Sequence, residues 1–189
     1  MLGLLIIVGL IVALILWVVS IYNGLVKLRV GSENAWSDID VQLKRRYELI
    51  PNLVETVKGY ATHERKTFED VTAARTRAMA AQGPAEKAQA EGMLTSALKS
   101  LFAVAEAYPE LRATENFQQL QKSLNELEDY IQSARRYYNA VVRDLNTRIQ
   151  QFPSNLVARQ FGFTEREFFE LGAEAERTVP KVDFGVGAA

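Results

Sequence analysis

Hydrophobic residues fill the start of the chain almost without interruption. The segment from Leu2 to Tyr22 reads LGLLIIVGLIVALILWVVSIY, and only Gly3, Gly9 and Ser20 in it are not strongly apolar or aromatic. At 1.5 Å per residue, a helix of this length crosses a hydrocarbon core of about 30 Å. The pattern therefore predicts a transmembrane anchor over residues 1–26, none of which carries a charged side chain.

A cleaved signal peptide is the competing interpretation of this segment. It would need a basic start, an apolar core of about 7–15 residues and small residues at the cleavage site. No Lys or Arg precedes the apolar run, and Val19, Ile21 and Tyr22 are bulky. We therefore expect a retained anchor.

Charges beside the anchor predict its orientation. Lys27 and Arg29 follow the span directly, whereas no basic residue precedes it. Because the cytoplasmic flanks of membrane helices carry an excess of Lys and Arg, we expect the N-terminus outside and the rest of the chain in the cytoplasm. This predicts a single-pass protein of an inner or plasma membrane, with the lipid bilayer as its first partner.

Beyond the anchor, apolar residues recur at spacings of three and four, the pattern of amphipathic helices. The first stripe predicts one long helix over residues 36–78, with a kink at Pro51 because proline removes a backbone donor and crowds the carbonyl four residues earlier. The helix is expected to end at Gln82-Gly83-Pro84. The residues of this first stripe are Trp36, Ile39, Leu43, Tyr47, Ile50, Val54, Val57, Ala61, Phe68, Val71 and Ala78.

Two further stripes follow. The second runs from Ala90 to Tyr108 and stops at Pro109, and the third runs from Phe117 to Phe152, where Pro153 ends it. The third keeps its alternation of three and four for about five heptads, which is typical of a bundle or coiled-coil seam. No segment alternates with period two over more than a few residues, so no sheet is predicted.

The C-terminal part of the chain predicts shorter elements. We expect a short helix over residues 154–161 and a further turn or two in which Thr164 and Glu167 form a capping box. Residues 178–189 are expected to be an irregular tail. The predicted fold class is all-α: one N-terminal transmembrane helix, then an antiparallel bundle of three long helices plus a short C-terminal helix over residues 27–177.

Several motifs resemble the signature of the bacterial LemA family. In chain order they are Tyr22-Asn23, Leu25-Val26, AWSDIDVQLKRR (35–46), LIPNLV (49–54), YPEL (108–111), Asn116-Phe117, ARRYYN (134–139), FPSN (152–155) and FGF (161–163). The resemblance covers nearly the whole chain and implies a helical bundle of the bacterial inner membrane without an established biochemical activity. It also implies a link to membrane-protein quality control near a membrane zinc protease, and a relative takes part in building magnetic organelles by membrane remodelling. Neither role brings catalytic residues that can be carried over.

Composition removes several classes of function. The 189 residues include 22 Lys plus Arg against 23 Asp plus Glu, a net charge of -1, no Cys and only one His, His63. Disulfide scaffolds, thiol nucleophiles, cysteine zinc sites and multi-histidine metal centres are therefore excluded. The balanced charge lacks the basic excess of a nucleic-acid-binding domain. We expect no metal, no cofactor and no nucleic-acid partner.

The residues that could carry chemistry lack the partners they need. His63-Glu64 begins a zinc-protease motif, but Thr67 stands where the second His is required. The carboxylate pairs at positions 38/40 and 126/128 are two residues apart, about 200° around a helix, and so do not face each other. We therefore expect that the protein is not an enzyme.

The basic run Lys44-Arg45-Arg46 has two interpretations. Acidic residues one turn away, such as Asp40 and Glu48, favour ion pairs within the chain. Anionic lipid headgroups are the alternative partner, although a straight helix places this run roughly 30 Å beyond the membrane. We favour the ion pairs.

Aromatic residues provide the candidate interaction surface. Six of the nine Phe fall at or after position 152, and such a density either caps one end of the bundle or offers an apolar surface to a partner. The first predicted helix is longer than the second, so we expect its membrane-proximal end to seek cover from another copy, giving a homo-oligomer. The candidate residues are Trp36, Ile39, Phe161, Phe163, Phe168 and Phe169.

These expectations support two classes of function. The first is a non-enzymatic, membrane-anchored scaffold or adaptor in membrane-protein quality control or envelope organisation, with a membrane zinc protease or another membrane protein as its partner. The alternative is a self-assembling homo-oligomer that shapes membranes. The size of the detergent-extracted particle separates them.

Overall fold

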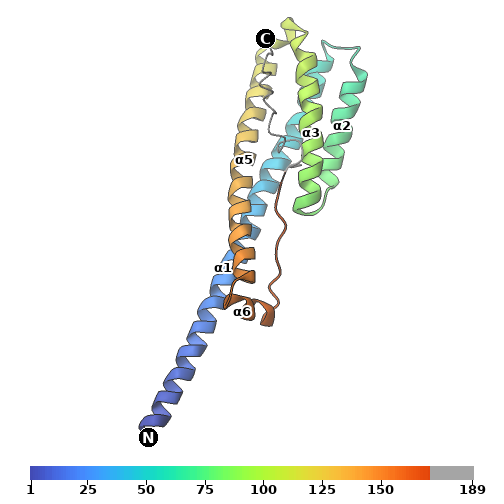
Figure 1. Cartoon of the computed structure of the whole chain (residues 1–189). Coiled ribbons are helices and arrows are strands. Elements are labelled where there is room, and N and C mark those ends of the chain that lie inside the picture. The colour runs from blue at the N-terminus through green and yellow to red at the C-terminus, as the bar shows by residue number, and fades with distance from the viewer. Residues whose placement is uncertain (171–189) are drawn as a thin grey trace, which may run out of the picture.

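The first helix, α1 (Leu2–Lys58), is 57 residues long and has no interruption. A computed structural model of the chain describes residues 1–170, and every structural statement below concerns that range. The N-terminal part of α1 projects away from the other helices, whereas its C-terminal part is packed among them (Figure 1). The boundary predicted between residues 26 and 27 therefore falls inside one continuous helix.

Pro51 lies inside α1 without ending it. Proline has no backbone N–H, so the carbonyl of Tyr47, four residues earlier, loses its helical partner. The Nε of Arg75 donates to this carbonyl instead, at 2.7 Å, from helix α2 (Arg65–Ala80). A contact between two helices thus replaces the hydrogen bond that the proline removes.

The single helix predicted over residues 36–78 is wrong, because the chain turns in the middle of it. α1 ends at Lys58, residues 59–64 form the turn, and α2 begins at Arg65. Helix α5 (Glu115–Gln150), the main partner of α1, has 36 residues, the same length as the stretch of α1 from residue 23 to residue 58. A longer α1 would extend past α5 and leave its apolar stripe without cover.

Proline, glycine and threonine start the remaining helices. Gly83 has a φ of +71°, a left-handed conformation that favours glycine, and Pro84 follows in the first turn of α3 (Gly83–Glu106). Pro109 opens the short α4 (Pro109–Arg112). The Thr114 hydroxyl caps α5 by accepting the Phe117 backbone N–H at 3.4 Å. The helix ends predicted before Pro84, Pro109 and Pro153 are confirmed to within a few residues.

The helices lie in antiparallel pairs. α1 runs beside α5 in the opposite direction (Figure 1). α2 runs beside α3, and this pair lies in the part of the domain farthest from the N-terminus (Figure 1). α1 also contacts both α2 and α3, so one apolar core connects all four. The described residues contain no strand, which confirms the all-α prediction for that part of the chain.

Helix α6 (Ser154–Gln160) closes the end of the domain nearest the N-terminus, at the bottom of Figure 1. Its bounds agree closely with the short helix predicted over residues 154–161. α6 packs on α1 and α5, where Leu25, Leu145 and Val157 form a second small core. Residues 163–170 after it are not helical, so the predicted capping box at Thr164 and Glu167 is wrong. This segment instead follows α5 back along the domain, as hydrogen bonds described below show. The expected tail over residues 178–189 lies outside the described residues.

Candidate functional site

The N-terminal part of α1 is apolar on all sides. Every side chain from Leu2 to Trp17 is exposed, and no other described residue covers this stretch. The helix is long and apolar enough here to cross a membrane. Soluble proteins rarely expose a contiguous apolar surface of this size, so the segment fits a membrane anchor.

Trp36 and Ile39 do not form the exposed surface predicted from the sequence. Ile39 is completely buried, and the half-buried ring of Trp36 has its centroid 5.5 Å from both the Tyr138 ring and the Phe169 ring. The cover comes from the same chain, because residues 163–170 fold back over this part of α1. The argument that Trp36 and Ile39 need a second copy for cover is therefore wrong.

The four predicted C-terminal phenylalanines divide into two groups. Phe163 and Phe169 are buried and Phe168 is half-buried, whereas Phe161 is 54% exposed. Phe163 packs edge-on against Tyr22, with ring centroids 5.7 Å apart, and lies 5.1 Å from the guanidinium carbon of Arg29. Most of this region therefore caps the domain, which was one of its two interpretations, and Phe161 remains at the surface.

Two asparagines of α5 hold the segment 163–170 in place. The side-chain amide of Asn146 donates to the carbonyl of Arg166 and accepts its N–H, both at 2.9 Å. Asn139 makes the same pair with Phe169, at 3.0 and 2.9 Å, and the Tyr138 hydroxyl donates to the Glu167 carbonyl at 2.8 Å. The asparagines are seven residues apart, two helical turns, so they lie on one face of α5. The spacing of the two asparagines can be seen in the sequence, but the backbone groups that they bind cannot.

A buried polar cluster joins α1, α3 and α5. Arg46 Nη1 lies 3.2 Å from Glu91 Oε2 and 3.0 Å from Glu128 Oε2, and Arg46 Nη2 donates to Thr95 Oγ1 at 3.1 Å. Arg46 is only 5% exposed and Glu91 only 2%. The ion-pair interpretation of the basic run is therefore confirmed for Arg46, whose partners lie on neighbouring helices and not one turn away on α1. Lys44 forms the expected local pair with Asp40, at 2.7 Å.

Burial controls the protonation of this cluster. It raises the pKa of Glu91 by more than the Tyr47 hydrogen bond and the Arg46 charge lower it. Burial and the adjacent Glu91 carboxylate also raise the pKa of Tyr47, whose hydroxyl donates to Glu91 Oε1. A phenol with a raised pKa does not ionise at neutral pH, and both groups already have partners, so the cluster ties helices together. Glu91 was not among the predicted site residues, although its place three residues before Leu94, on the apolar stripe, is a signal for a buried charge.

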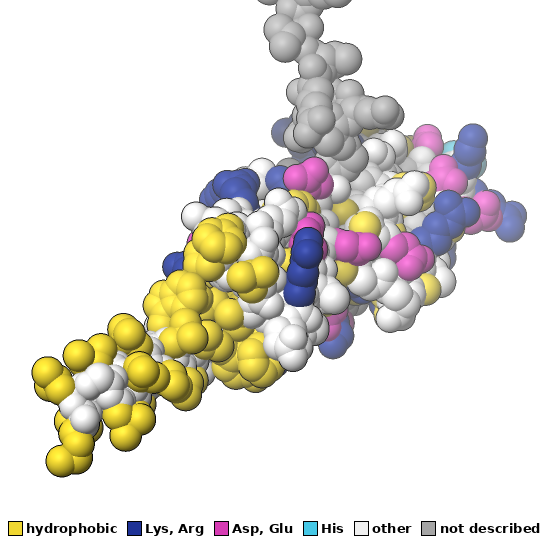
Figure 2. All heavy atoms as spheres, turned by 60° about the horizontal axis from the view of Figure 1, so that its bottom comes forward, with side chains coloured by type: hydrophobic (Ala, Val, Ile, Leu, Met, Phe, Trp, Pro, Cys, Tyr) yellow, Lys and Arg dark blue, Asp and Glu magenta, His cyan; other side chains and the backbone are white. Residues whose placement is uncertain are grey.

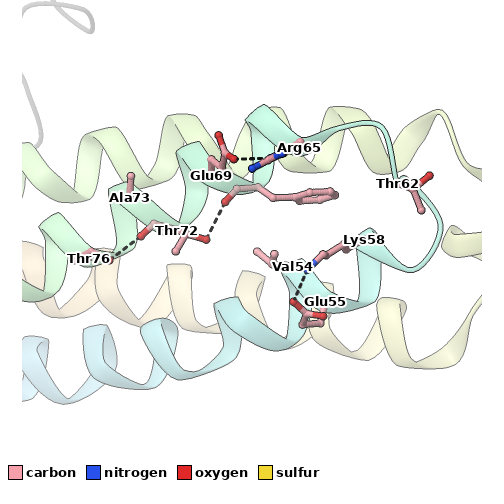
Figure 3. A pocket seen from close by; sticks show the side chains of 10 residues that line it. Val54, Glu55, Lys58, Thr62, Arg65, Glu69, Thr72, Ala73 and Thr76 are labelled. Carbon is pink, nitrogen blue, oxygen red and sulfur yellow. Dashed lines mark hydrogen bonds and ion pairs between the residues drawn. The ribbon is translucent and has the colours of Figure 1, made fainter.

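A groove of about 620 Å³ opens between the end of α1 and α2 (Figure 3). Val54 and Phe68, both 8% exposed, provide apolar lining. Two exposed ion pairs stand on its sides, Arg65 Nε with Glu69 Oε1 at 2.8 Å and Lys58 Nζ with Glu55 Oε1 at 3.4 Å. Apolar lining with paired charges of both signs suits an amphipathic protein segment better than a small anion.

His63 and Glu64 lie in the turn between α1 and α2, and His63 is exposed. Among residues 1–170, no group of three or more His, Asp or Glu side chains could hold a metal ion.

A helical domain that continues from one long, exposed, apolar N-terminal helix fits the class of membrane-anchored helical proteins. The sequence model of the LemA family matches residues 35–184. The chain belongs to the LemA family, and the resemblance seen in its motifs is confirmed.

Named relatives share most of the chain at low identity. Magnetosome protein MamQ 2 of Paramagnetospirillum magneticum is 28% identical, with 85% of this chain and 68% of the relative covered. Magnetosome protein MamQ of Magnetospirillum gryphiswaldense is 27% identical over 84% and 68% of the two chains. Protein LemA of Metamycoplasma hominis is 26% identical over 82% of this chain and 71% of the relative.

Proposed function

We propose that the chain is a non-enzymatic, membrane-anchored scaffold or adaptor that serves membrane-protein quality control or envelope organisation. The observation that supports it is the continuity of α1, which is exposed and apolar at one end and forms the core of the domain at the other. A continuous helix couples anchor and domain without a flexible joint. At 1.5 Å per residue, the groove at Glu55 stands about 50 Å from residue 20 along the helix axis.

Several features fit an adaptor better than an enzyme. The buried charged side chains of Arg46 and Glu91 are paired with each other, and the Tyr47 hydroxyl donates to Glu91. The groove between α1 and α2 has apolar lining and paired charges on its sides. Such a surface can hold part of another protein without performing chemistry on it.

The proposed location is the bacterial inner membrane, with the N-terminus outside and the domain in the cytoplasm. Lys27 and Arg29 next to the span support this orientation. The proposed partner is a membrane protein, and a membrane zinc protease is the first to test because the family resemblance implies one.

The test is purification of the full chain from native membranes in mild detergent, followed by mass spectrometry and particle sizing. The adaptor proposal predicts small particles enriched in one membrane protein. Thr76→Arg, which places a large cation in the groove, should reduce that enrichment, whereas Gln121→Arg on the exposed face of α5 should not. Equal enrichment with both variants would remove the groove from the proposal, and the absence of any enriched partner would contradict the adaptor.

The second candidate function is a self-assembling homo-oligomer that shapes membranes. It is supported by relatives named as magnetosome proteins, which match 84–85% of this chain. The same purification tests it, because a single large particle that contains only this chain would favour assembly. Trp36 and Ile39 are covered within one chain, so such an assembly would have to use another surface.

A further inference from the structure

α6 and the residues that flank it carry large apolar side chains that the rest of residues 1–170 leaves uncovered. Phe152, Leu156 and Phe161 are 74%, 58% and 54% exposed. The opposite face of the same short helix is well packed, with Val157 and Ala158 buried against α1 and α5. Three exposed large hydrophobics around one seven-residue helix are an unusual feature of a surface in contact with water.

The position of α6 shows where these side chains lie along α1. The Tyr22 and Phe161 rings touch edge to face, with centroids 4.8 Å apart. Figure 1 shows α6 lying across the lower end of the domain, beside the point where α1 leaves it. In Figure 2 the hydrophobic surface continues from the N-terminal end of α1 onto this end of the domain.

The length of the apolar segment fixes the level of the membrane boundary. A hydrocarbon core of about 30 Å needs about 20 helical residues. Counted from Leu2, the span ends near Ile21 and Tyr22, the level at which Phe161 contacts α1. A bilayer around α1 therefore reaches the outer face of α6.

Cations predominate at this end of the domain, although Asp144 and Glu165 lie at its edge. Lys27, Arg29, Arg148 and Arg159 are exposed, and none forms an ion pair within the described part of the chain. No Asp or Glu occurs in residues 1–32 or 145–164. Four cations around an apolar surface match the composition of helices that lie in an anionic membrane interface.

We propose that α6, with Phe152, Leu156 and Phe161, is a second membrane contact that inserts into the interfacial layer of the bilayer spanned by α1. The four cations contact the phosphates of anionic lipids around it. This inference rests on the membrane anchor of the proposed function and adds a contact that fixes the tilt of the domain on the membrane. A domain held by α1 alone could lean in any direction, whereas a second contact to one side of α1 selects one.

The experiment uses the natural absence of cysteine to label one site at a time in the full chain. Leu156→Cys carries an environment-sensitive fluorophore in liposomes of phosphatidylcholine with phosphatidylglycerol, and spin-labelled lipid is the quencher. Leu10→Cys on α1 and Tyr130→Cys on α5 are matched controls, since Leu10, Leu156 and Tyr130 are 66%, 58% and 65% exposed. Interfacial helices lie about 5–10 Å deep, so we expect at least about twofold more quenching at Leu156→Cys than at Tyr130→Cys.

Each outcome has a defined consequence. Quenching at Leu10→Cys but not at Leu156→Cys would overturn the α6 contact and leave the anchor in place. No quenching at either position would overturn the anchor and the contact together. A disulfide-linked dimer through Leu156→Cys would assign the surface to a second copy of the chain instead of lipid.

A charge variant tests the lipid headgroups. Arg148→Glu with Arg159→Glu should reduce quenching at Leu156→Cys in the anionic liposomes while leaving it unchanged at Leu10→Cys. The same loss should follow when phosphatidylglycerol is omitted. Quenching at Leu156→Cys that is insensitive to both changes would overturn the role of the cations.

Discussion

Removing the Arg46 guanidinium should be one of the most destabilising single changes in the domain. In Arg46→Met the Glu91 carboxylate, 2% exposed, loses its ion pair at 3.2 Å and keeps the Tyr47 hydroxyl as its hydrogen-bond donor. Breaking a buried ion pair on one side costs about 3–5 kcal/mol, because the remaining charge loses its closest counter-ion, although the Lys87 charge still attracts Glu91. With a urea m-value of about 2 kcal/mol/M, the unfolding midpoint should fall by roughly 1.5–2.5 M.

The matched control lies two residues away on the same helix. Lys44→Met removes an ion pair of 2.7 Å in which the Lys44 side chain is 67% exposed, and such surface pairs contribute about 0–1 kcal/mol. Both variants are unfolded by urea in mild detergent and followed by circular dichroism. The double variant Arg46→Met/Glu91→Gln should recover about half of the loss or more, since the buried charge is then absent.

The same variant has a predicted pH dependence. A carboxyl whose folded pKa is raised contributes stability that is fully present below its unfolded pKa and is lost as pH rises through the folded pKa. Burial raises the pKa of Glu91 above its ordinary 4.5, and removal of Arg46 raises it further. The deficit of Arg46→Met should therefore be larger at about pH 7 than at about pH 5. A deficit no larger than that of Lys44→Met at both pH values would refute the reasoning.

Three further predictions concern other parts of the chain. Phe169→Ala removes a fully buried ring that covers Trp36 and should lower the free energy of unfolding by about 3–5 kcal/mol. Phe161→Ala removes an exposed ring and should lower it by less than about 1 kcal/mol. Equal losses would contradict the folded-back segment. His63→Ala should change stability by less than about 0.5 kcal/mol, and the purified protein should contain no stoichiometric zinc or iron by elemental analysis. Alkaline phosphatase fused after Ala189 should be inactive, because the proposed orientation places it in the cytoplasm. Two Lys added before Leu2 together with Lys27→Glu and Arg29→Glu should weaken the preference for this orientation. A fully active fusion of the unmodified chain would contradict the proposed orientation.

The helices and the anchor could be predicted from the sequence because local features determine them. Apolar spacing of three and four marks the helical faces, and Pro84, Pro109 and Pro153 mark helix ends, whereas Pro51 lies inside α1 because Arg75 binds the carbonyl that it leaves free. The anchor follows from an uncharged segment that water does not solvate well. The break after Lys58 was missed although His63 and Glu64 interrupt the apolar stripe, because the stripe resumes at Phe68, seven residues after buried Ala61 and so on the same helical face.

The partners of the long helices were decided only by the tertiary structure. Glu91 is 45 residues from Arg46, and Phe169 is 133 residues from Trp36, so no local pattern links the members of either pair. Asn139 and Asn146 show a spacing of seven in the sequence, but the backbone groups they bind belong to a segment whose capping-box pattern predicted a helical turn that does not form. Local propensity specifies which residues become helical and which face is apolar. The segment that covers that face is specified by the lengths of the packed helices and by hydrogen bonds that form only once the chain has folded back on itself.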